Sequence, residues 1–168
     1  MADSIRLLQP EDEELVLHLF ERCREYFENV EGRSPSRDVA YEILTQLPPG
    51  KQKKEKQVFG FFDDEDRLTA LVDLVRDYPV DKEWIIGLLL VAPEHRGRGM
   101  AQKIHDYIQT HASGNGAALL RVAVLEINEP GRRFWQGMGY YEIKRVPYPR
   151  GEGVTTAIVM NKKTGSAD

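Results

Sequence analysis

The chain has 168 residues, of which 41% are hydrophobic, 30% charged and 9% aromatic, and these are the proportions of an ordinary globular protein. They exclude a collagen-like or largely disordered chain, and the length is that of one domain with one core. The 23 Lys and Arg against 27 Asp and Glu leave a formal charge of -4, so the molecule as a whole has no general attraction for phosphate backbones. Nucleic acid is therefore not expected as a main partner.

The sequence carries no signal for a membrane or for secretion. Its longest uncharged apolar run, Ile85 to Pro93, has about nine residues, far fewer than the ~20 that cross a bilayer. The opening MADSIRLLQPEDEE has acids where a secretion signal needs basic and then apolar residues. Cys23 is the one cysteine, so neither an internal disulfide nor a cysteine-based zinc site can form. We expect a cytoplasmic protein with no membrane contact and, since its four histidines are scattered, no metal.

The first part of the chain predicts one strand, two helices and a loop. Ile5 to Leu8 is a short apolar strand. From Leu15 to Val30, apolar residues recur every three or four positions, which predicts one amphipathic helix. Ser36 is placed to cap a second helix, which Pro48-Pro49-Gly50 ends. The run Lys51 to Lys56 is then expected to be a solvated loop.

The rest of the chain predicts a mixed sheet with further helices. Gln57 to Phe62 and Leu68 to Val75 are antiparallel strands joined by the acidic turn Asp63 to Asp66. Trp84 to Val91 is apolar on both faces, so it should lie at the centre of the sheet and be covered on each side. The remaining predicted elements are a helix with Met100, Ile104 and Ile108 on one face that ends at Gly114, a strand at Ala117 to Leu125, a short helix from Asn128 to Gly139, and strands at Tyr140 to Val146 and Thr155 to Met160.

The stretch from Leu89 to Ala101 runs from the expected central strand through a Gly- and Arg-rich turn into a helix. Gly97 and Gly99 allow backbone conformations closed to other residues, so successive N–H groups can point at one phosphate at the helix N-terminus. Arg96 and Arg98 would add positive charge. The turn lacks the Gly-Lys-Ser/Thr of a Walker A loop and the spacing of the Rossmann fingerprint. It predicts a local anion site, against the alternative of a tight turn with exposed arginines.

This turn resembles a signature of the GNAT family of N-acetyltransferases, Arg/Gln-x-x-Gly-x-Gly/Ala after a central strand, which here reads Arg96-x-x-Gly99-x-Ala101. About thirty residues later the chain approaches a second family signature, Asn-x-x-Ala-x-x-aromatic-Tyr-x-x-x-Gly-Phe, through Asn128, Gly131, Phe134, Trp135, Gly139 and Tyr140. The order of the predicted elements is also that of the family. The resemblance implies a mixed α/β fold as a single acyl-CoA-binding domain over residues 1–168, with about seven strands, a splayed central strand and about four helices.

The resemblance further implies acetyl-coenzyme A as cosubstrate and no metal. The pyrophosphate would lie on the turn, the pantetheine arm would pair like an extra strand with the central strand, and Asn128 would contact the same arm. The residues expected to bind the cosubstrate are Leu89, Val91, Arg96, Gly97, Arg98, Gly99, Met100, Ala101, Gln102 and Asn128. A peptide-like arm can satisfy N–H and C=O groups that a splayed strand leaves unpaired. For Asn128 the alternative is a helix N-cap, and the two roles can coexist.

The catalytic residues depart from the family pattern. An acceptor amine with a pKa near ~10 is almost wholly protonated at pH 7, so a base would help. Many family members use a Glu on the central or the following strand as base and the signature Tyr as acid. These positions are Gly87, Ala123 and Trp135 here. An indole N–H donates a hydrogen bond but is no proton source near neutrality, and Trp135, with Phe134, is expected to pack against the core or to cover the thioester pocket.

Three residues are candidates for the missing base: Asp73, Tyr78 and Glu83. Asp73 lies between apolar neighbours and is either a buried base with a raised pKa or a residue on the solvated face of its strand. Tyr78 and Glu83 bound the loop where an acceptor would enter, although loop residues of these types are commonly just exposed. Direct attack by an amine that loses its proton to water needs no named base and stays open.

The leading hypothesis is an enzyme that moves an acetyl group from acetyl-coenzyme A to a primary amine of a small molecule or a peptide by direct attack. The alternative is a non-catalytic module that binds coenzyme A or an acyl form as a sensor or regulator. Release of free thiol in the presence of amines separates the two. Nucleic-acid binding through Lys51 to Lys56 is disfavoured by the net charge and by the lack of interleaved aromatic residues, and a homodimer is compatible with either hypothesis.

Overall fold

The computed structural model describes residues 4–165 and shows a mixed α/β domain built on one seven-stranded sheet. The strands are β1 (Ser4–Leu7), β2 (Lys56–Phe62), β3 (Leu68–Val75), β4 (Glu83–Val91), β5 (Leu119–Leu125), β6 (Tyr141–Arg150) and β7 (Gly153–Lys163). The helices are α1 (Glu13–Arg22), α2 (Arg24–Tyr26), α3 (Arg37–Thr45), α4 (Met100–Gly114) and α5 (Glu129–Gly137). Shorter helical turns are η1 (Pro10–Asp12), η2 (Phe27–Glu31, a π-helix), η3 (Lys53–Glu55) and η4 (Pro93–His95).

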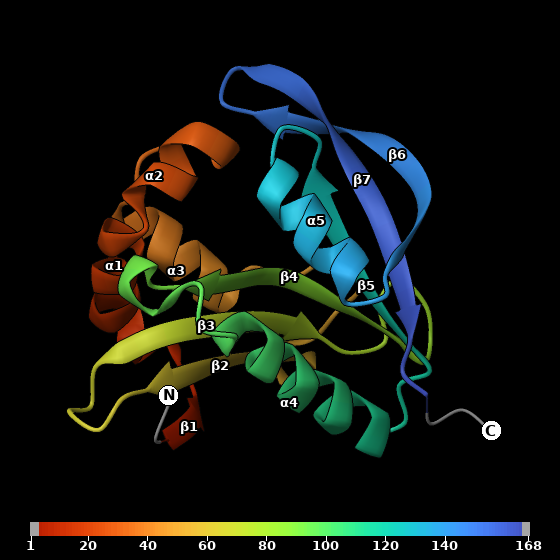
Figure 1. The fold of residues 1–168 in the computed structure, drawn as a ribbon, viewed down its shortest axis with the longest axis horizontal. Coiled ribbons are helices and arrows are strands. Elements are labelled where there is room, and N and C mark those ends of the chain that lie inside the picture. Colours follow the sequence, from red (N-terminus) through yellow and green to blue (C-terminus); the bar gives the residue numbers. More distant parts are fainter. Residues whose placement is uncertain (1–3, 166–168) are drawn as a thin grey trace.

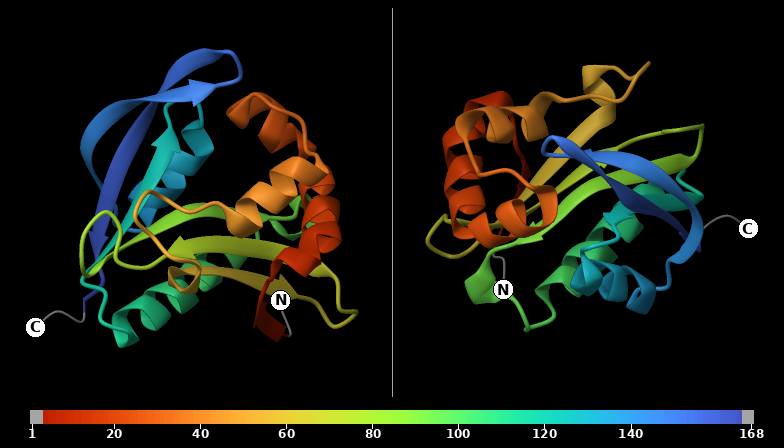
Figure 2. Two further views of the ribbon diagram at one scale, coloured as in Figure 1. Left: turned by 180° about the vertical axis from the view of Figure 1, so that it is seen from behind. Right: turned by 90° about the horizontal axis from the view of Figure 1, so that it is seen from above.

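The sheet has the order β1-β2-β3-β4-β5-β7-β6, which places β4 at its centre. One face is covered by α1, α2 and α3 and the other by α4, as Figures 1 and 2 show. Each face has its own apolar core, with Leu88 and Leu90 of β4 contributing to the first and Trp84 and Ile86 to the second. The prediction of a central strand covered on both sides is therefore confirmed.

The two halves of the sheet separate between β4 and β5. These parallel strands pair from Glu83–Ile86 to Leu119–Val122, and the pairing stops there although β4 continues to Val91 and β5 to Leu125. Figure 1 shows the two strands diverging from this point. The splayed central strand implied by the family resemblance is thus confirmed.

A β-bulge marks the place where the strands separate. Leu74 of β3 is paired with Ile86 and Asp73 with Leu88, so Gly87 is an extra residue without a partner on β3. Such a residue bends its strand and increases the local twist. The bulge follows directly after the last β4 residue that is paired with β5, and it directs β4 away from β5.

The single helix predicted from Leu15 to Val30 is wrong in one respect. The helix is interrupted at Cys23, which is 1% exposed, and continues as α2 and the π-helical η2. The rings of Phe20 and Phe27 lie 4.5 Å apart across the break. Cys23 and Phe27 stay on the buried face. The spacing of apolar residues therefore remains helical across the interruption and does not reveal it.

The prediction of a solvated loop over Lys51 to Lys56 is wrong for its last residue. Lys56 begins β2, and its side chain, only 5% exposed, forms an ion pair with Asp73 at 2.8 Å. A carboxylate buried on β3 needs a compensating cation, and Lys56 is the residue that reaches it. Ser36, in contrast, caps α3 as predicted, since its hydroxyl accepts a hydrogen bond from the backbone N–H of Val39.

Within the described part of the chain, no helix is both long enough and apolar enough to span a bilayer.

Candidate active site

The turn between β4 and α4 presents a row of backbone donors. Gly97 and Gly99 have φ of +77° and +76°, a region that favours glycine, and a Cβ added at either would meet nothing within 4 Å. Within residues 4–165, the backbone N–H groups of residues 97–102 donate to no acceptor. They lie at the N-terminus of a 15-residue helix, where the helix dipole favours negative charge. The turn therefore fits a phosphate or pyrophosphate group.

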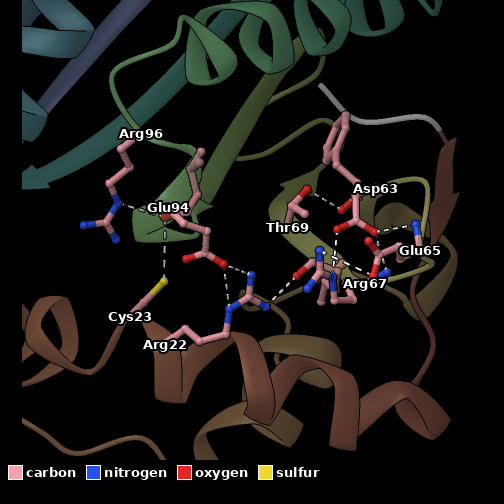
Figure 3. Close-up of polar contacts among 11 residues, drawn as sticks. Arg22, Cys23, Asp63, Glu65, Arg67, Thr69, Glu94 and Arg96 are labelled. Atoms are coloured by element: carbon pink, nitrogen blue, oxygen red, sulfur yellow. Dashed lines mark hydrogen bonds and ion pairs between the residues drawn. The ribbon is translucent and has the colours of Figure 1, made fainter.

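The arginines of this turn do different things. Arg96 folds back, and its Nε donates to the carbonyl of Val91 at 2.9 Å, while the thiol of Cys23 lies 3.7 Å from the same oxygen (Figure 3). Arg22 of α1 pairs with Glu94 just before the turn. The guanidinium of Arg98, in contrast, forms no hydrogen bond or ion pair within the described residues. Arg96 thus braces the turn, and Arg98 is the arginine left to meet an anion.

Cys23 acts here as a donor and not as a nucleophile. Burial is the main cause that raises the pKa of its thiol, against the attraction of Arg96. The thiol therefore stays protonated near neutral pH and helps to hold the end of β4 against α1.

The open edge of β4 offers backbone groups to an extended ligand. The N–H of Ala92 donates to the carbonyl of Thr69 on the β3 side at 2.8 Å. Because strand residues alternate, the polar backbone groups of Leu89 and Val91 point the other way, toward β5. The carbonyl of Val91 already accepts from Arg96 and Cys23, so the groups left for a ligand are the N–H and C=O of Leu89 and the N–H of Val91. Pairing with β5 has already ended at Ile86, so these groups face the region between the strands. This is the arrangement that strand addition by a peptide-like arm requires.

Asn128 lies beyond the end of β5 and caps α5. Its side-chain oxygen accepts from the N–H of Gly131 at 3.1 Å, which confirms the N-cap. A Cβ on Gly131 would come within 2.4 Å of the Asn128 amide nitrogen, so glycine is needed for this close cap. The Nδ2 group makes no hydrogen bond within residues 4–165 and is left to donate elsewhere. The second predicted role, contact with the pantetheine arm, stays a prediction.

Asp73 occupies the space that a side chain on Gly87 would take. A Cβ at Gly87 would lie 2.8 Å from Oδ2 of Asp73, while Oδ1 accepts from Lys56 Nζ at 2.8 Å. The residue is 8% exposed, so it is not on a solvated face. Burial is the largest influence and raises the pKa of Asp73, and Lys56 opposes that rise. One carboxylate oxygen is thus held by a cation, and the other borders the bulge where β4 and β5 part.

Tyr78 and Glu83 lie at the other end of β4. Glu83 begins the strand, and its carboxylate is 3.3 Å from Arg121 of β5, in the region where the two strands are still paired. Leu88, opposite Asp73, is five residues further on, about 16 Å along an extended strand. The backbone N–H of Tyr78 donates to the carbonyl of Glu83 at 2.6 Å, which closes the β3–β4 connection. The structure does not bring these two residues together with Asp73.

A buried pair that the sequence did not reveal joins α4 to the segment between α5 and β6. Nε2 of His105 lies 2.8 Å from the hydroxyl of Tyr140, and both side chains are enclosed in the core. Burial lowers the pKa of His105 to about 4 and raises that of Tyr140 far above its usual value. The available signal was the hydroxyl at Tyr140, where the family signature has Phe, because a buried hydroxyl needs a partner.

Trp135 packs beside this pair. Its ring lies 5.1 Å from that of Tyr140 and 5.0 Å from that of Phe134, and the side chain is 9% exposed. The packing expected of Trp135 is confirmed. Its indole N–H forms no hydrogen bond within the described residues, so it can still donate one to a ligand.

Comparison with known proteins agrees with these features. The model of the Acetyltransferase (GNAT) family matches residues 14–140. An acetyltransferase from Thermus thermophilus superposes with a TM-score of 0.75 and 21% identity over 97% of this chain and 99% of its own. A probable acetyltransferase from Staphylococcus epidermidis gives 0.73 and 20%, over 96% and 98%. Spermidine N-acetyltransferase from Vibrio cholerae, solved with CoA and spermine, gives 0.74 and 16%, over 97% and 96%.

A comparison with curated protein sequences finds no match. Within the described residues, no three His, Cys, Asp or Glu side chains gather as metal ligands. The family match covers most of the chain, and the solved structures share its fold over at least 96% of the chain. The chain therefore belongs to the GNAT family of acetyltransferases.

Proposed function

We propose that this acetyltransferase uses acetyl-coenzyme A to acetylate a primary amine of a small molecule or peptide. The observation that carries the proposal is the row of unpaired N–H groups at residues 97–102, which follows the part of β4 that no longer pairs with β5. A protein with a net charge of -4 has no general attraction for anions, so an anion must be held by a local device of this kind.

The residues divide the work of holding the cosubstrate. The N–H groups of residues 97–102, with Arg98, would hold the pyrophosphate, and Arg96 would keep the turn in shape through its bond to Val91. Leu89 and Val91 would pair with the pantetheine arm, and the amide of Asn128 would donate to it from the β5 side. When bound, acetyl-coenzyme A supplies the acetyl group as a thioester that an amine can attack.

Asp73 is the residue we propose as the base. Its Oδ2 would accept a proton from the acceptor ammonium, which leaves a neutral nitrogen able to attack the thioester carbon. Burial raises the pKa of this carboxylate toward that of an effective base, and Lys56 fixes its orientation through Oδ1. After the attack the nitrogen loses a second proton to water as the carbon–sulfur bond breaks. Trp135 would donate a hydrogen bond and no proton, so the departing thiolate would take its proton from water.

The test is thiol release from acetyl-coenzyme A over a panel of polyamines, amino acids, aminoglycosides and peptides. Asp73→Asn should lower the turnover about a hundredfold or more and leave the affinity for acetyl-coenzyme A within threefold. Asp64→Asn, in the exposed β2–β3 turn, is the matched control and should match the wild type. Because Asp73→Asn leaves Lys56 without its partner, the double variant with Lys56→Met keeps the site neutral and checks that the loss is not one of folding. Turnover within threefold of the wild type in both variants would refute the assignment.

Gly87→Ala tests the same geometry from β4. The added methyl would meet Oδ2 of Asp73 at 2.8 Å and must displace it. The turnover should therefore fall although no ionisable group has been removed, and acetyl-coenzyme A should still bind. A fully active Gly87→Ala enzyme would show that the position of this carboxylate does not matter.

A second candidate function is a non-catalytic acyl-CoA-binding module. It is favoured by the absence of an acid at Gly87 and Ala123, which are both exposed where β4 and β5 part. Binding of acetyl-coenzyme A without thiol release from any amine on the panel would establish it. For either function we propose a reducing, cytoplasmic location, because the lone Cys23 is a buried free thiol.

A further inference from the structure

We propose that a pocket on the β1–β2 side of α4 is a second binding site, which takes a small aromatic anion. The pocket has a volume of about 170 Å³. It is lined by Ile5, Phe61, His95, Arg98, Met100, Lys103, Ile104 and Tyr107. These residues come from β1, from β2, and from the turn and first two turns of α4.

The interior of the pocket is apolar and favours a ligand with an aromatic ring. Phe61, Met100 and Ile104 are buried and form its floor, while Ile5 and Tyr107 are 40% and 38% exposed and form its walls. The ring of Tyr107 is held edge-on to that of Phe61, with centroids 6.0 Å apart, so this wall is a fixed aromatic surface. An apolar cavity of about 150 Å³ is enough to take benzene. The volume here therefore suits one six-membered ring with a small substituent.

The rim of the pocket is positively charged. Arg98, Lys103 and His95 border it, and the side chains of Arg98 and Lys103 form no hydrogen bond or ion pair within residues 4–165. Nearly all other arginines in that range are paired or hydrogen-bonded, and the chain as a whole has a charge of -4. Two unpaired cations above an apolar floor complement a ring that carries a carboxylate or another compact anion.

The pocket is distinct from the proposed cosubstrate site. Phe61 and Ile5 are cross-strand neighbours on β2 and β1, at the edge of the sheet, whereas β4 and β5 separate at its centre. In Figure 1, β1 and β2 lie on the far side of β3 from that separation. Arg98 and Met100 border both regions, but the remaining lining residues are not among those proposed to bind the cosubstrate. When Arg98 is engaged by the pyrophosphate, Lys103 is the cation that still pairs with a carboxylate in the pocket, so a ligand here and acetyl-coenzyme A should bind together.

The binding test uses 4-fluorobenzoate, observed by ¹⁹F NMR with the full chain. We expect saturable binding with one site per chain. Uncharged 4-fluorobenzyl alcohol, which has the same ring, should bind at least tenfold more weakly, because it cannot pair with the cations of the rim. Absence of saturable binding up to 10 mM, or equal binding of the alcohol, would overturn the proposal.

Two matched pairs of variants locate the site. Ile5→Trp should fill the pocket and weaken 4-fluorobenzoate binding at least tenfold. Leu7→Trp is its control, because Leu7 is on the same strand, is also 40% exposed and does not line the pocket. Lys103→Met should weaken the binding of 4-fluorobenzoate about fivefold and leave the binding of 4-fluorobenzyl alcohol unchanged. Lys54→Met, on an exposed turn, should change the binding of neither probe. Binding that survives Ile5→Trp would place the probe elsewhere and overturn the proposal.

Competition separates this site from the cosubstrate site. Saturating coenzyme A should leave the bound 4-fluorobenzoate in place. Displacement would show that the pocket belongs to the coenzyme A site, which would refute a second site. Loss of coenzyme A binding with retained 4-fluorobenzoate binding would count against the proposed function and leave this inference standing.

Discussion

Acidification should weaken the contact between α4 and Tyr140, in the segment between α5 and β6, because His105 is buried there as a neutral imidazole. The pKa of His105 is lowered from 6.5 to about 4, mainly by burial, with Lys162 adding to the effect. Its Nε2 faces the Tyr140 hydroxyl, and its Nδ1 makes no hydrogen bond among the described residues and lies 3.9 Å from Oδ1 of Asp106. A proton added to this ring would therefore place a charge in the core, and the nearby carboxylate of Asp106 is largely exposed and offsets only part of the cost of burial.

The sign and size of the effect follow from linkage. The unfolded chain binds a proton at His105 below about pH 6.5 and the folded chain only below about pH 4, so the free energy of unfolding falls as the pH falls through this window. The difference between the pKa of His105 in the unfolded and the folded chain corresponds to about 3.4 kcal/mol of stability when fully developed. Between pH 7 and pH 5 the loss is about 1.8 kcal/mol. Stability from this group is fully present above the unfolded pKa.

The assay is urea unfolding at a series of pH values, for the wild type and for His105→Gln. The variant has no titrating group at this position. Between pH 7 and pH 5 its free energy of unfolding should therefore fall by about 1.8 kcal/mol less than that of the wild type. Carboxylates with a lowered pKa, such as Asp12, lose their contribution at lower pH in both proteins alike. His18→Gln removes an exposed histidine and should follow the wild type. Parallel curves for the wild type and His105→Gln would refute the burial argument.

Two further predictions concern the proposed site. Gly99→Val should lose acetyl-coenzyme A binding, measured by calorimetry, but keep the native circular dichroism spectrum. The reason is that a β-branched residue does not tolerate φ of +76° at a turn open to the ligand. Retained micromolar affinity would contradict this. Trp135→Phe should keep turnover within about tenfold of the wild type, and Trp135→Tyr should be at least as active, because the indole supplies no proton. A loss of about a thousandfold in Trp135→Phe at unchanged affinity and stability would show that this side chain takes part in the chemistry.

The features that could be predicted from the sequence are those with a local physical cause. The continuous apolar run of Trp84 to Val91 can be buried on both faces only in a central strand, and that is where β4 lies. Gly97 and Gly99 stand where the backbone turns to positive φ, and the helix predicted through Ile104 and Ile108 follows them. Period, turn chemistry and capping each act over a few residues, so the sequence shows them directly.

The features that could not be predicted depend on contacts between distant segments. Lys56 is the last residue of a lysine-rich run, and only the pairing of β2 with β3 brings it to Asp73. His105 and Tyr140 are 35 positions apart and meet because α4 packs against the segment that follows α5. In each case a polar side chain is buried because it has a partner elsewhere in the chain. The spacing of apolar residues does not predict that partner.

At Gly87 the sequence and the structure lead to different conclusions about the base. In the sequence it stands where relatives often carry a glutamate, and it indicates only that a base is missing. In the structure, the missing side chain leaves space at the bulge, and Asp73 of the neighbouring strand fills that space with a carboxylate oxygen. A glutamate at position 87 would collide with that carboxylate and would place two like charges side by side in a buried site. Under the proposed function the carboxylate is therefore supplied by β3 instead of β4, and a glutamate introduced at position 87 should be tested together with a substitution of Asp73.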